Sequence, residues 1–116
     1  MKEIFGVEQL DEFILENIDK GNVIVLYFGA TWCGPCKQLK TKLGESETAS
    51  LMPKLVVGYL DVDDETNSKL VKKYKISSLP TQVFVKLDDN KVVPITRIEG
   101  YDFIKLELEY RKLSIK

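Results

Sequence analysis

The segment Val23–Phe28 reads VIVLYF and is apolar at every position. A strand that alternates apolar and polar residues can leave one face in water, whereas a strand that is apolar throughout has to be covered on both faces. Residues 55–60 (LVVGYL) form a second run of this kind. The simplest architecture that covers both faces is a layered one, with helices on both sides of a central sheet. The sequence therefore predicts an α/β fold.

Four segments place apolar residues at helical spacing and supply the helices that such a sheet needs. They are Val7–Ile18, Cys36–Leu43, Leu70–Tyr74 and Phe103–Leu113. Short polar side chains that favour helix starts precede several of them. Asp63 or Asp64 is predicted to cap the third helix and Asp102 the last, and Ser46 is predicted to cap a short extra turn after the second.

Two further segments, Gln82–Leu87 and Val92–Ile98, are predicted to pair as a hairpin across the polar turn Asp88–Asn90. Pro94 has no backbone N–H to donate, so the second arm is expected at the edge of the sheet. With a short first strand near Lys2–Phe5, the predicted order of elements is βαβαβαββα in a central mixed β-sheet.

Length and composition narrow the class of protein. The 116 residues, 44% of them hydrophobic, suffice for a single domain, expected over residues 1–116. Seventeen basic and 18 acidic residues give a net charge of -1, which disfavours nucleic acid and membrane surfaces as partners. The N-terminus has no apolar stretch of signal-peptide length, and no run is long enough to span a bilayer. We therefore expect a cytoplasmic protein that is a monomer.

The absence of histidine and the presence of two cysteines narrow the chemistry. Without histidine the chain can build neither a Cys–His pair nor a Ser–His–Asp triad, and it offers no imidazole to a metal. The cytoplasm keeps thiols reduced, and a bridge between Cys33 and Cys36 would close too small a loop to add much stability. If this pair oxidises, the oxidation serves a reaction.

The pair belongs to the motif Cys33-Gly34-Pro35-Cys36, where a predicted buried strand ends and a helix begins. Two intervening residues let the first helical turn bring both sulfurs within bonding distance. The free N–H groups and the positive end of the helix dipole favour a thiolate on Cys33. Pro35 suits an early helical position, where its missing N–H has no partner to lose. The motif thus predicts that Cys33 attacks and that Cys36 resolves the mixed disulfide.

Two other interpretations of the motif stay open on this evidence. Zinc usually takes four N or S ligands, and two thiols without histidine supply enough only if a dimer pools two pairs. The second interpretation, two small buried side chains at a helix start, gives no reason for Gly34 and Pro35 between them.

The segment Tyr27–Lys37 (YFGATWCGPCK) closely resembles the active-site segment of thioredoxins, and Ser78–Thr81 (SLPT), placed before a strand, resembles the cis-proline loop of that family. The resemblance extends over almost the whole chain in the order of its elements. It implies the thioredoxin fold, with the redox-active Cys33–Cys36 disulfide in place of any cofactor and with no metal.

The resemblance also implies which residues contact a substrate. Pro80 would form a cis peptide bond facing the disulfide, the backbone of Leu79 would bind an extended substrate segment, and Gly100 would lie at the rim. Trp32, beside the thiol, is interpreted as a flat docking surface. The predicted substrate-binding residues are Trp32, Gly34, Pro35, Leu79, Pro80 and Gly100.

One departure from the family concerns proton transfer. Thioredoxins usually bury an aspartate six residues before the first cysteine, with a lysine on the adjacent strand, and this chain has Tyr27 and Tyr59 at those positions. Losing both charges together avoids leaving one buried alone, and two phenols can hydrogen-bond each other or a water. Since the aspartate is thought to help the second thiol ionise, the change affects how Cys36 loses its proton. Asp61 is a candidate substitute, because it shares a strand face with Tyr59.

The predicted function is that of a thiol–disulfide oxidoreductase that reduces disulfide-containing proteins. An upstream reductase such as a thioredoxin reductase would then return its disulfide to the dithiol. The alternative is a substrate-binding or chaperone-like module with slow thiol turnover, which the tyrosine at position 27 makes worth testing. A glutaredoxin-like use of glutathione is disfavoured, because such proteins usually carry a tyrosine within the C-x-x-C motif. A zinc-bridged dimer would contain bound metal.

Overall fold

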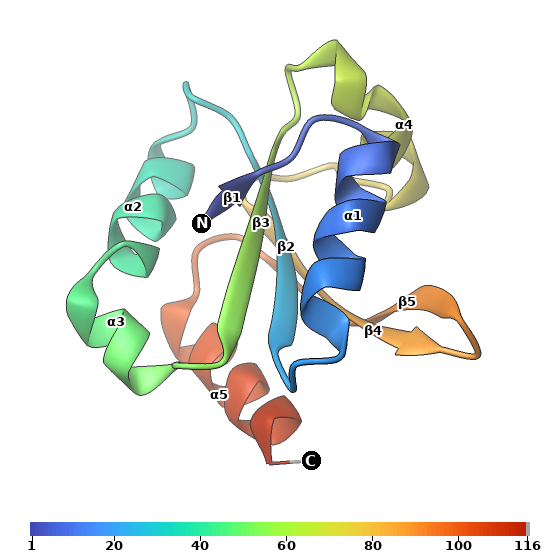
Figure 1. Ribbon diagram of the computed structural model, residues 1–116. Helices are drawn as coiled ribbons and strands as arrows, with labels where there is room; N and C mark the ends of the chain where they lie inside the picture. Colours follow the sequence, from blue (N-terminus) through green and yellow to red (C-terminus); the bar gives the residue numbers. More distant parts are fainter. Residues whose placement is uncertain (116) are drawn as a thin grey trace.

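Five strands form one mixed sheet in the computed structural model, which describes residues 1–115 (Figure 1). The order across the sheet is β1-β3-β2-β4-β5. The neighbours β1, β3 and β2 run parallel, whereas β4 and β5 are antiparallel to their neighbours. The strands are β1 (Lys2–Glu3), β2 (Val23–Gly29), β3 (Leu55–Asp61), β4 (Thr81–Asp88) and β5 (Lys91–Glu99). The predicted mixed sheet is therefore confirmed.

Helices cover both faces of this sheet, as expected (Figure 1). One face packs against α1 and α4, the other against α2 and α5, with α3 beside α2. The helices are α1 (Val7–Ile18), α2 (Gly34–Leu43), α3 (Ser46–Leu51), α4 (Ser68–Lys73) and α5 (Phe103–Ser114), and a 3-10 helix, η1 (Glu65–Asn67), leads into α4.

The central strand β2 is buried at all seven of its positions. Because successive side chains of a strand point to opposite faces, its residues divide between two cores. Val23, Val25 and Tyr27 pack with α2 and α5, and the intervening residues Ile24, Leu26 and Phe28 pack with α1 and α4. This two-sided burial is the physical reason why the run in the sequence is apolar without alternation.

The helix starts agree with the sequence only in part. Asp102 caps α5 as predicted, accepting a hydrogen bond of 3.0 Å from the backbone N–H of Lys105. The prediction that Ser46 caps a turn is wrong, because α3 already includes Ser46 and Ala49 donates its N–H to the carbonyl of Glu45.

The start of α4 also differs from the prediction. Asp64 does act as a cap, but for η1, where its carboxylate accepts the N–H of Thr66 at 2.9 Å. The α-helix itself begins at Ser68, three residues after η1 begins. Asp63 caps neither element. The separate 3-10 turn allows Asn67 to point inward before the α-helix starts.

The hairpin of β4 and β5 turns through two residues, Asp89 and Asn90, both with positive φ angles of 52° and 61°. Asp and Asn tolerate this left-handed conformation better than most residues. The strand β5 lies at the edge of the sheet, and Pro94 pairs with Val85 next to a register shift. The edge position predicted from Pro94 is confirmed.

Asn67 is a fully buried polar residue that joins three segments at one end of the sheet. Its Oδ1 accepts the N–H of Gly6 at 2.9 Å, and its Nδ2 donates to the carbonyls of Ile4 and Asp61 at 3.2 and 3.1 Å. Buried backbone groups need such partners, since their desolvation is otherwise uncompensated. The side chain thus fixes the end of β3 relative to the loop that leads from β1 into α1.

We predict that Asn67→Ala lowers the free energy of unfolding by roughly 2–4 kcal/mol, because one donor and two acceptors lose their partner in a buried site. Urea denaturation followed by circular dichroism measures this change. Asn22→Ala is the matched control: it removes a single side-chain hydrogen bond of 3.3 Å to Asn17 and is expected to cost about 1 kcal/mol or less. Equal losses in the two variants would contradict the role given to Asn67.

Candidate active site

The two cysteines lie where the loop after β2 enters α2, as the sequence predicted. Cys33 is the N-cap residue of α2, with an extended backbone, and its Sγ accepts the N–H of Cys36 at 3.2 Å. The two residues form a disulfide, with their Cα atoms 5.2 Å apart. The first sulfur is therefore held at the positive end of a helix by a backbone donor, a setting that stabilises a thiolate after reduction.

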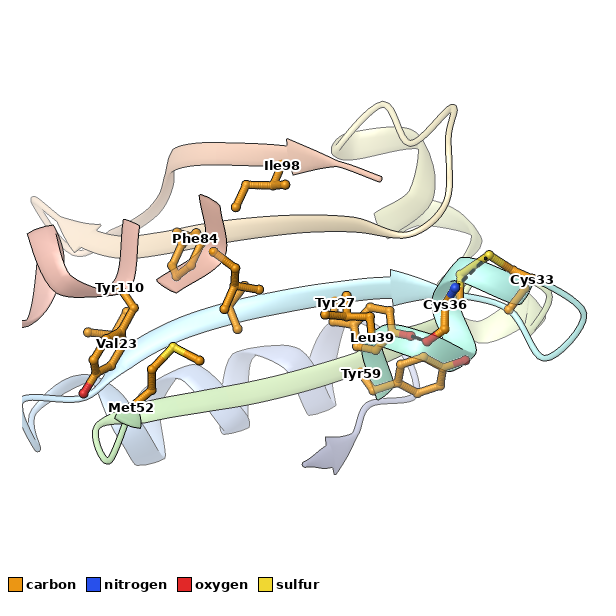
Figure 2. Packing of buried hydrophobic residues seen from close by; sticks show 13 residues of the cluster. Val23, Tyr27, Cys33, Cys36, Leu39, Met52, Tyr59, Phe84, Ile98 and Tyr110 are labelled. Carbon is orange, nitrogen blue, oxygen red and sulfur yellow. Dashed lines mark hydrogen bonds between the residues drawn. A yellow bond between two sulfur atoms is a disulfide. The ribbon is translucent and has the colours of Figure 1, made fainter. Parts of the chain in front are cut away.

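Both sulfur-bearing residues belong to the core that packs against α2 and α5, but to different depths (Figure 2). Cys33 is 6% exposed and Cys36 2%. The residues beside Cys33 are exposed: Gly34 and Pro35 open α2, and Pro35 occupies the early helical position predicted for it. A reaction partner therefore approaches Cys33 across an exposed rim, while Cys36 is covered by the protein.

Trp32 is 68% exposed, so it is not a core residue. Its Nε1 donates a hydrogen bond of 2.6 Å to the carboxylate of Asp63. Asp63 occupies neither cap position, which belong to Asp64 for η1 and Asn67 for α4. The carboxylate instead holds the indole at the surface directly before Cys33, where the ring offers a flat apolar face.

The second predicted motif forms a turn joined to the end of β5. The peptide bond between Leu79 and Pro80 is cis, as the resemblance implied. The carbonyl of Pro80 accepts the N–H of Gly100 at 2.7 Å, and Gly100 has a φ of 94° that favours glycine. Leu79 packs against the core that contains both cysteines. The structure thus brings Pro80 and Gly100, about 20 residues apart in sequence, into direct contact.

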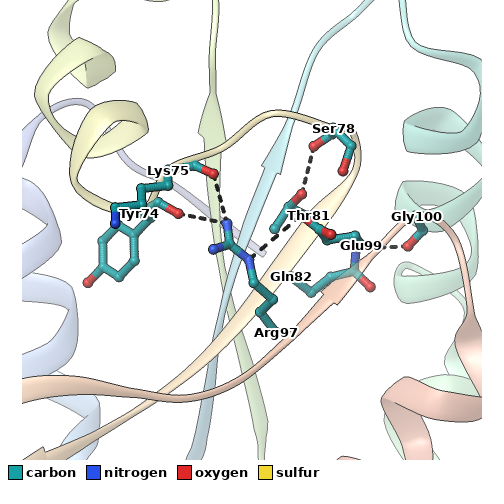
Figure 3. Close-up of polar contacts among 8 residues, drawn as sticks. All are labelled: Tyr74, Lys75, Ser78, Thr81, Gln82, Arg97, Glu99 and Gly100. Carbon is teal, nitrogen blue, oxygen red and sulfur yellow. Dashed lines mark hydrogen bonds and ion pairs between the residues drawn. The ribbon is translucent and has the colours of Figure 1, made fainter.

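Polar contacts hold this turn from both ends (Figure 3). The hydroxyl of Thr81 donates to the carbonyl of Ser78 at 2.6 Å, and Nε2 of Gln82 donates to the carbonyl of Gly100 at 3.2 Å. Arg97 donates to the carbonyl of Tyr74 at 2.6 Å, which ties the end of α4 to β5. Thr81 belongs to the motif that the sequence analysis identified, and its contact is local. The contacts of Gln82 and Arg97 were not predicted, because they join segments that meet only in the fold.

Tyr27 and Tyr59 lie on neighbouring strands beneath Cys36. Their rings meet edge to face, with centroids 5.0 Å apart and planes at 70°. The Tyr27 hydroxyl does not donate to Tyr59, as one expectation had it, but to the backbone carbonyl of Cys36 at 2.5 Å. The edge-to-face packing of the rings allows this, since it leaves the Tyr27 hydroxyl free to reach α2.

Gly29 explains why both rings fit beside the sulfur. A Cβ at this position would lie 2.9 Å from the Tyr27 ring, 3.2 Å from the Tyr59 ring and 3.4 Å from the Sγ of Cys36. The absence of a side chain at the end of β2 therefore makes room for the tyrosines and for the second sulfur together.

Neither phenol can act as a base for Cys36 near neutral pH. Burial, and to a lesser extent the neighbouring Tyr59, raises the pKa of Tyr27 well above its ordinary value of about 10. Burial also raises the pKa of Tyr59, with smaller contributions from nearby carboxylates, Asp61 first among them. Tyr27 is therefore a hydrogen-bond donor that keeps its proton.

Neither a membrane-spanning helix nor a metal-binding cluster is found in the part of the chain that the structure describes. Within residues 1–115, no helix is both long and apolar enough to cross a membrane. In the same residues, no three acidic or cysteine side chains gather in a way that could hold a metal ion.

Comparisons with known proteins agree with this geometry. The thioredoxin family model matches residues 5–103. Thioredoxin of Chlamydia pneumoniae is 36% identical over 104 residues, which cover 90% of this chain and 92% of that protein. The X-ray structure of Fasciola hepatica thioredoxin has a TM-score of 0.78 at 31% identity and covers 97% of this chain and 98% of its own. The germline-specific thioredoxin Deadhead of Drosophila melanogaster has a TM-score of 0.76 at 33% identity, with 97% and 99% covered.

The family model covers most of the chain, the fold is that of the matched structures, and the C-x-x-C pair of this chain is at disulfide distance. The chain belongs to the thioredoxin family and is a thioredoxin-type thiol–disulfide oxidoreductase, a protein-disulfide reductase.

Proposed function

We propose that the protein reduces disulfides in other proteins by attack of the Cys33 thiolate and resolution by Cys36, and that a reductase of the thioredoxin reductase type restores the dithiol. The observation that carries this assignment is the unequal setting of the two sulfurs. Cys33 caps α2 beside an exposed rim, and Cys36 lies deeper in the core.

The substrate chain is proposed to bind across the rim formed by Trp32, the backbone of Leu79 and Gly100. Gly34 and Pro35 present little side chain next to Cys33, so a folded partner can approach closely. An extended segment of the substrate can pair with the backbone of Leu79, in the manner of added strands. A held substrate segment keeps its sulfur near Cys33 long enough for exchange.

The reaction balances without a cofactor. The Cys33 thiolate attacks one sulfur of the substrate disulfide, and the other sulfur leaves as a thiolate that takes up a proton. The Cys36 thiolate then attacks the sulfur of Cys33, so the protein disulfide forms and the second substrate sulfur is released. Two electrons pass from the protein dithiol to the substrate, and the reductase supplies the next pair.

Two further properties stay predictions: that the protein is cytoplasmic and that it is a monomer. Cell fractionation tests the first and size-exclusion chromatography with light scattering the second.

We predict that Cys33→Ser abolishes the reduction of insulin disulfides, whereas Cys36→Ser still attacks and accumulates a mixed disulfide on Cys33. The reason is that only a thiolate at the helix start can begin the exchange, and only Cys36 can complete it within the chain. Turbidity of reduced insulin measures turnover, and mass spectrometry of the intact protein detects the trapped adduct. Accumulation of an adduct on Cys36 in Cys33→Ser, with no adduct in Cys36→Ser, would reverse the two roles.

A second prediction concerns the proton of Cys36. Because Tyr27 keeps its own proton, resolution in this protein is expected to be slow near neutral pH and to accelerate as pH rises and the thiolate fraction grows. The double variant Tyr27→Asp with Tyr59→Lys introduces a carboxylate together with its counter-charge. We expect its rate of resolution to depend less on pH between 6 and 9 than that of the native protein.

The measurement follows the decay of a mixed disulfide on Cys33 from pH 6 to 9 in both proteins. Tyr27→Asp alone serves as the control, and it is expected to lose stability because it buries a carboxylate without its lysine. Equal pH profiles in the native protein and the double variant would show that another group takes the proton, with Asp61 the first to test.

A further inference from the structure

The hydroxyl of Tyr27 makes a direct bond between the central strand and the residue that carries the resolving sulfur. Tyr27 lies on β2, and Cys36 is the third residue of α2. The hydroxyl donates to the Cys36 carbonyl at 2.5 Å, and Tyr27 itself is 1% exposed (Figure 2). A helix carbonyl has two lone pairs, so it can accept this bond in addition to its bond within the helix. The bond therefore fixes the first turn of α2 against the sheet.

The position of Tyr27 is in turn fixed by Tyr59 and by α2. The ring of Tyr59, 7% exposed, packs edge to face on Tyr27. The ammonium group of Lys40, one turn beyond Cys36, lies 4.9 Å from the centroid of the Tyr59 ring, within the range of a cation–π contact. The helix thus contacts the tyrosine pair at two points, through the Cys36 carbonyl and through Lys40.

The tyrosine pair also closes the space on the sheet side of Cys36. A Cβ on Gly29 would lie within 3.4 Å of both rings and of the Cys36 sulfur, so these groups surround one small volume. The sulfur of Cys36 therefore has little room to turn toward the sheet, and in this structure it is bonded to the sulfur of Cys33.

We propose that Tyr27 is the positioning residue of the resolving step: by holding the Cys36 carbonyl, it keeps the Cys36 sulfur in line with Cys33 while Cys33 is bonded to the substrate. This inference rests on the proposed roles of the two cysteines. In that step the Cys36 thiolate, its proton lost to water, forms a bond to the Cys33 sulfur. The bond between Cys33 and the substrate breaks, and the substrate sulfur leaves as a thiolate.

The size of the effect follows from the geometry of an intramolecular reaction. A displacement of about 1 Å between reacting groups can cost up to roughly a hundredfold in rate. Removing one hydrogen bond while keeping the ring displaces α2 by less, so we expect resolution to slow by roughly tenfold. The attack by Cys33 precedes this step. It uses Cys36 only through the backbone N–H that the Cys33 sulfur accepts. That bond is kept when the phenol hydroxyl is removed, so the rate of attack is expected to stay the same.

The effect is expected to be independent of pH. Tyr27 keeps its proton because burial raises its pKa. The charged groups nearest the pair, Lys40, Asp61, Glu3 and Asp63, act on Tyr59. If Tyr27 positions Cys36, removing its hydroxyl therefore lowers the rate of resolution by the same factor at every pH. If Tyr27 took part in proton transfer, removing the hydroxyl would change the shape of the pH profile.

The experiment uses Tyr27→Phe in the full chain, with Tyr110→Phe as the matched control. Tyr110 is a buried tyrosine of the same core, 4% exposed, whose hydroxyl accepts the N–H of Lys54 at 2.9 Å at the far end of the sheet (Figure 2). Both variants thus lose one hydrogen bond between a buried tyrosine and the backbone. Far-UV circular dichroism checks that each is folded, which the retained ring favours.

The probe is the aromatic disulfide 5,5'-dithiobis(2-nitrobenzoic acid), mixed in less than stoichiometric amount with the reduced protein in a stopped-flow instrument. Attack by Cys33 releases one coloured thiolate, and resolution by Cys36 releases the second. For Tyr27→Phe we expect an unchanged first phase and a second phase slowed roughly tenfold by the same factor at pH 6, 7, 8 and 9. Tyr110→Phe is expected to leave both phases unchanged.

Three results would overturn the inference: a second phase in Tyr27→Phe as fast as in the native protein, a slowing that varies with pH, or an equal slowing in Tyr110→Phe. Failure of the proposed function is a different result, because the native protein would then release one coloured thiolate and never the second.

Discussion

Burial of β2 on both of its faces is the constraint on which the other features of this structure depend. All seven residues of the strand are buried, and their side chains divide between two cores. Burial of apolar surface supplies most of the driving force for folding, at roughly 25 cal/mol per Å², so the helices on both faces are stabilised largely through this strand. The disulfide lies directly beyond the end of β2. The strand that organises the core thus also determines where the reactive sulfurs are held.

The site combines rigid support below the sulfurs with an exposed rim around them. The helix start supplies the N–H that contacts the Cys33 sulfur, and the sheet supplies Tyr27 and Tyr59 beneath Cys36. Trp32 is instead held at the surface by the carboxylate of Asp63. A thiol that exchanges with protein disulfides needs both the rigid support and the exposed rim, because its own geometry has to be fixed while large partners bind and dissociate.

The tyrosine pair shows how one buried charge pair can be replaced without leaving a charge alone. A carboxylate or an ammonium in the core is costly unless its partner is present, whereas two phenols are neutral over the physiological range. Here the neutral pair also gains a contact, since the Tyr27 hydroxyl reaches the backbone of α2. Because burial raises the pKa of both phenols, neither takes up the proton of Cys36, and we propose that this proton passes to water.

The elements and the reactive residues follow from the sequence by itself, because they depend on local patterns. The apolar run at Val23–Phe28 determined a strand with two buried faces, and Cys33 with Pro35 determined a reactive helix start. Only the tertiary structure decided the contacts between segments far apart in the chain, because a local sequence pattern does not predict which distant residue a side chain will meet. Asn67 joins Gly6 to Asp61, and Gly100 meets Pro80. The hydroxyl of Tyr27 is satisfied by the Cys36 carbonyl and not by Tyr59, because the angle between the two rings, set by the pairing of β2 with β3, directs it there.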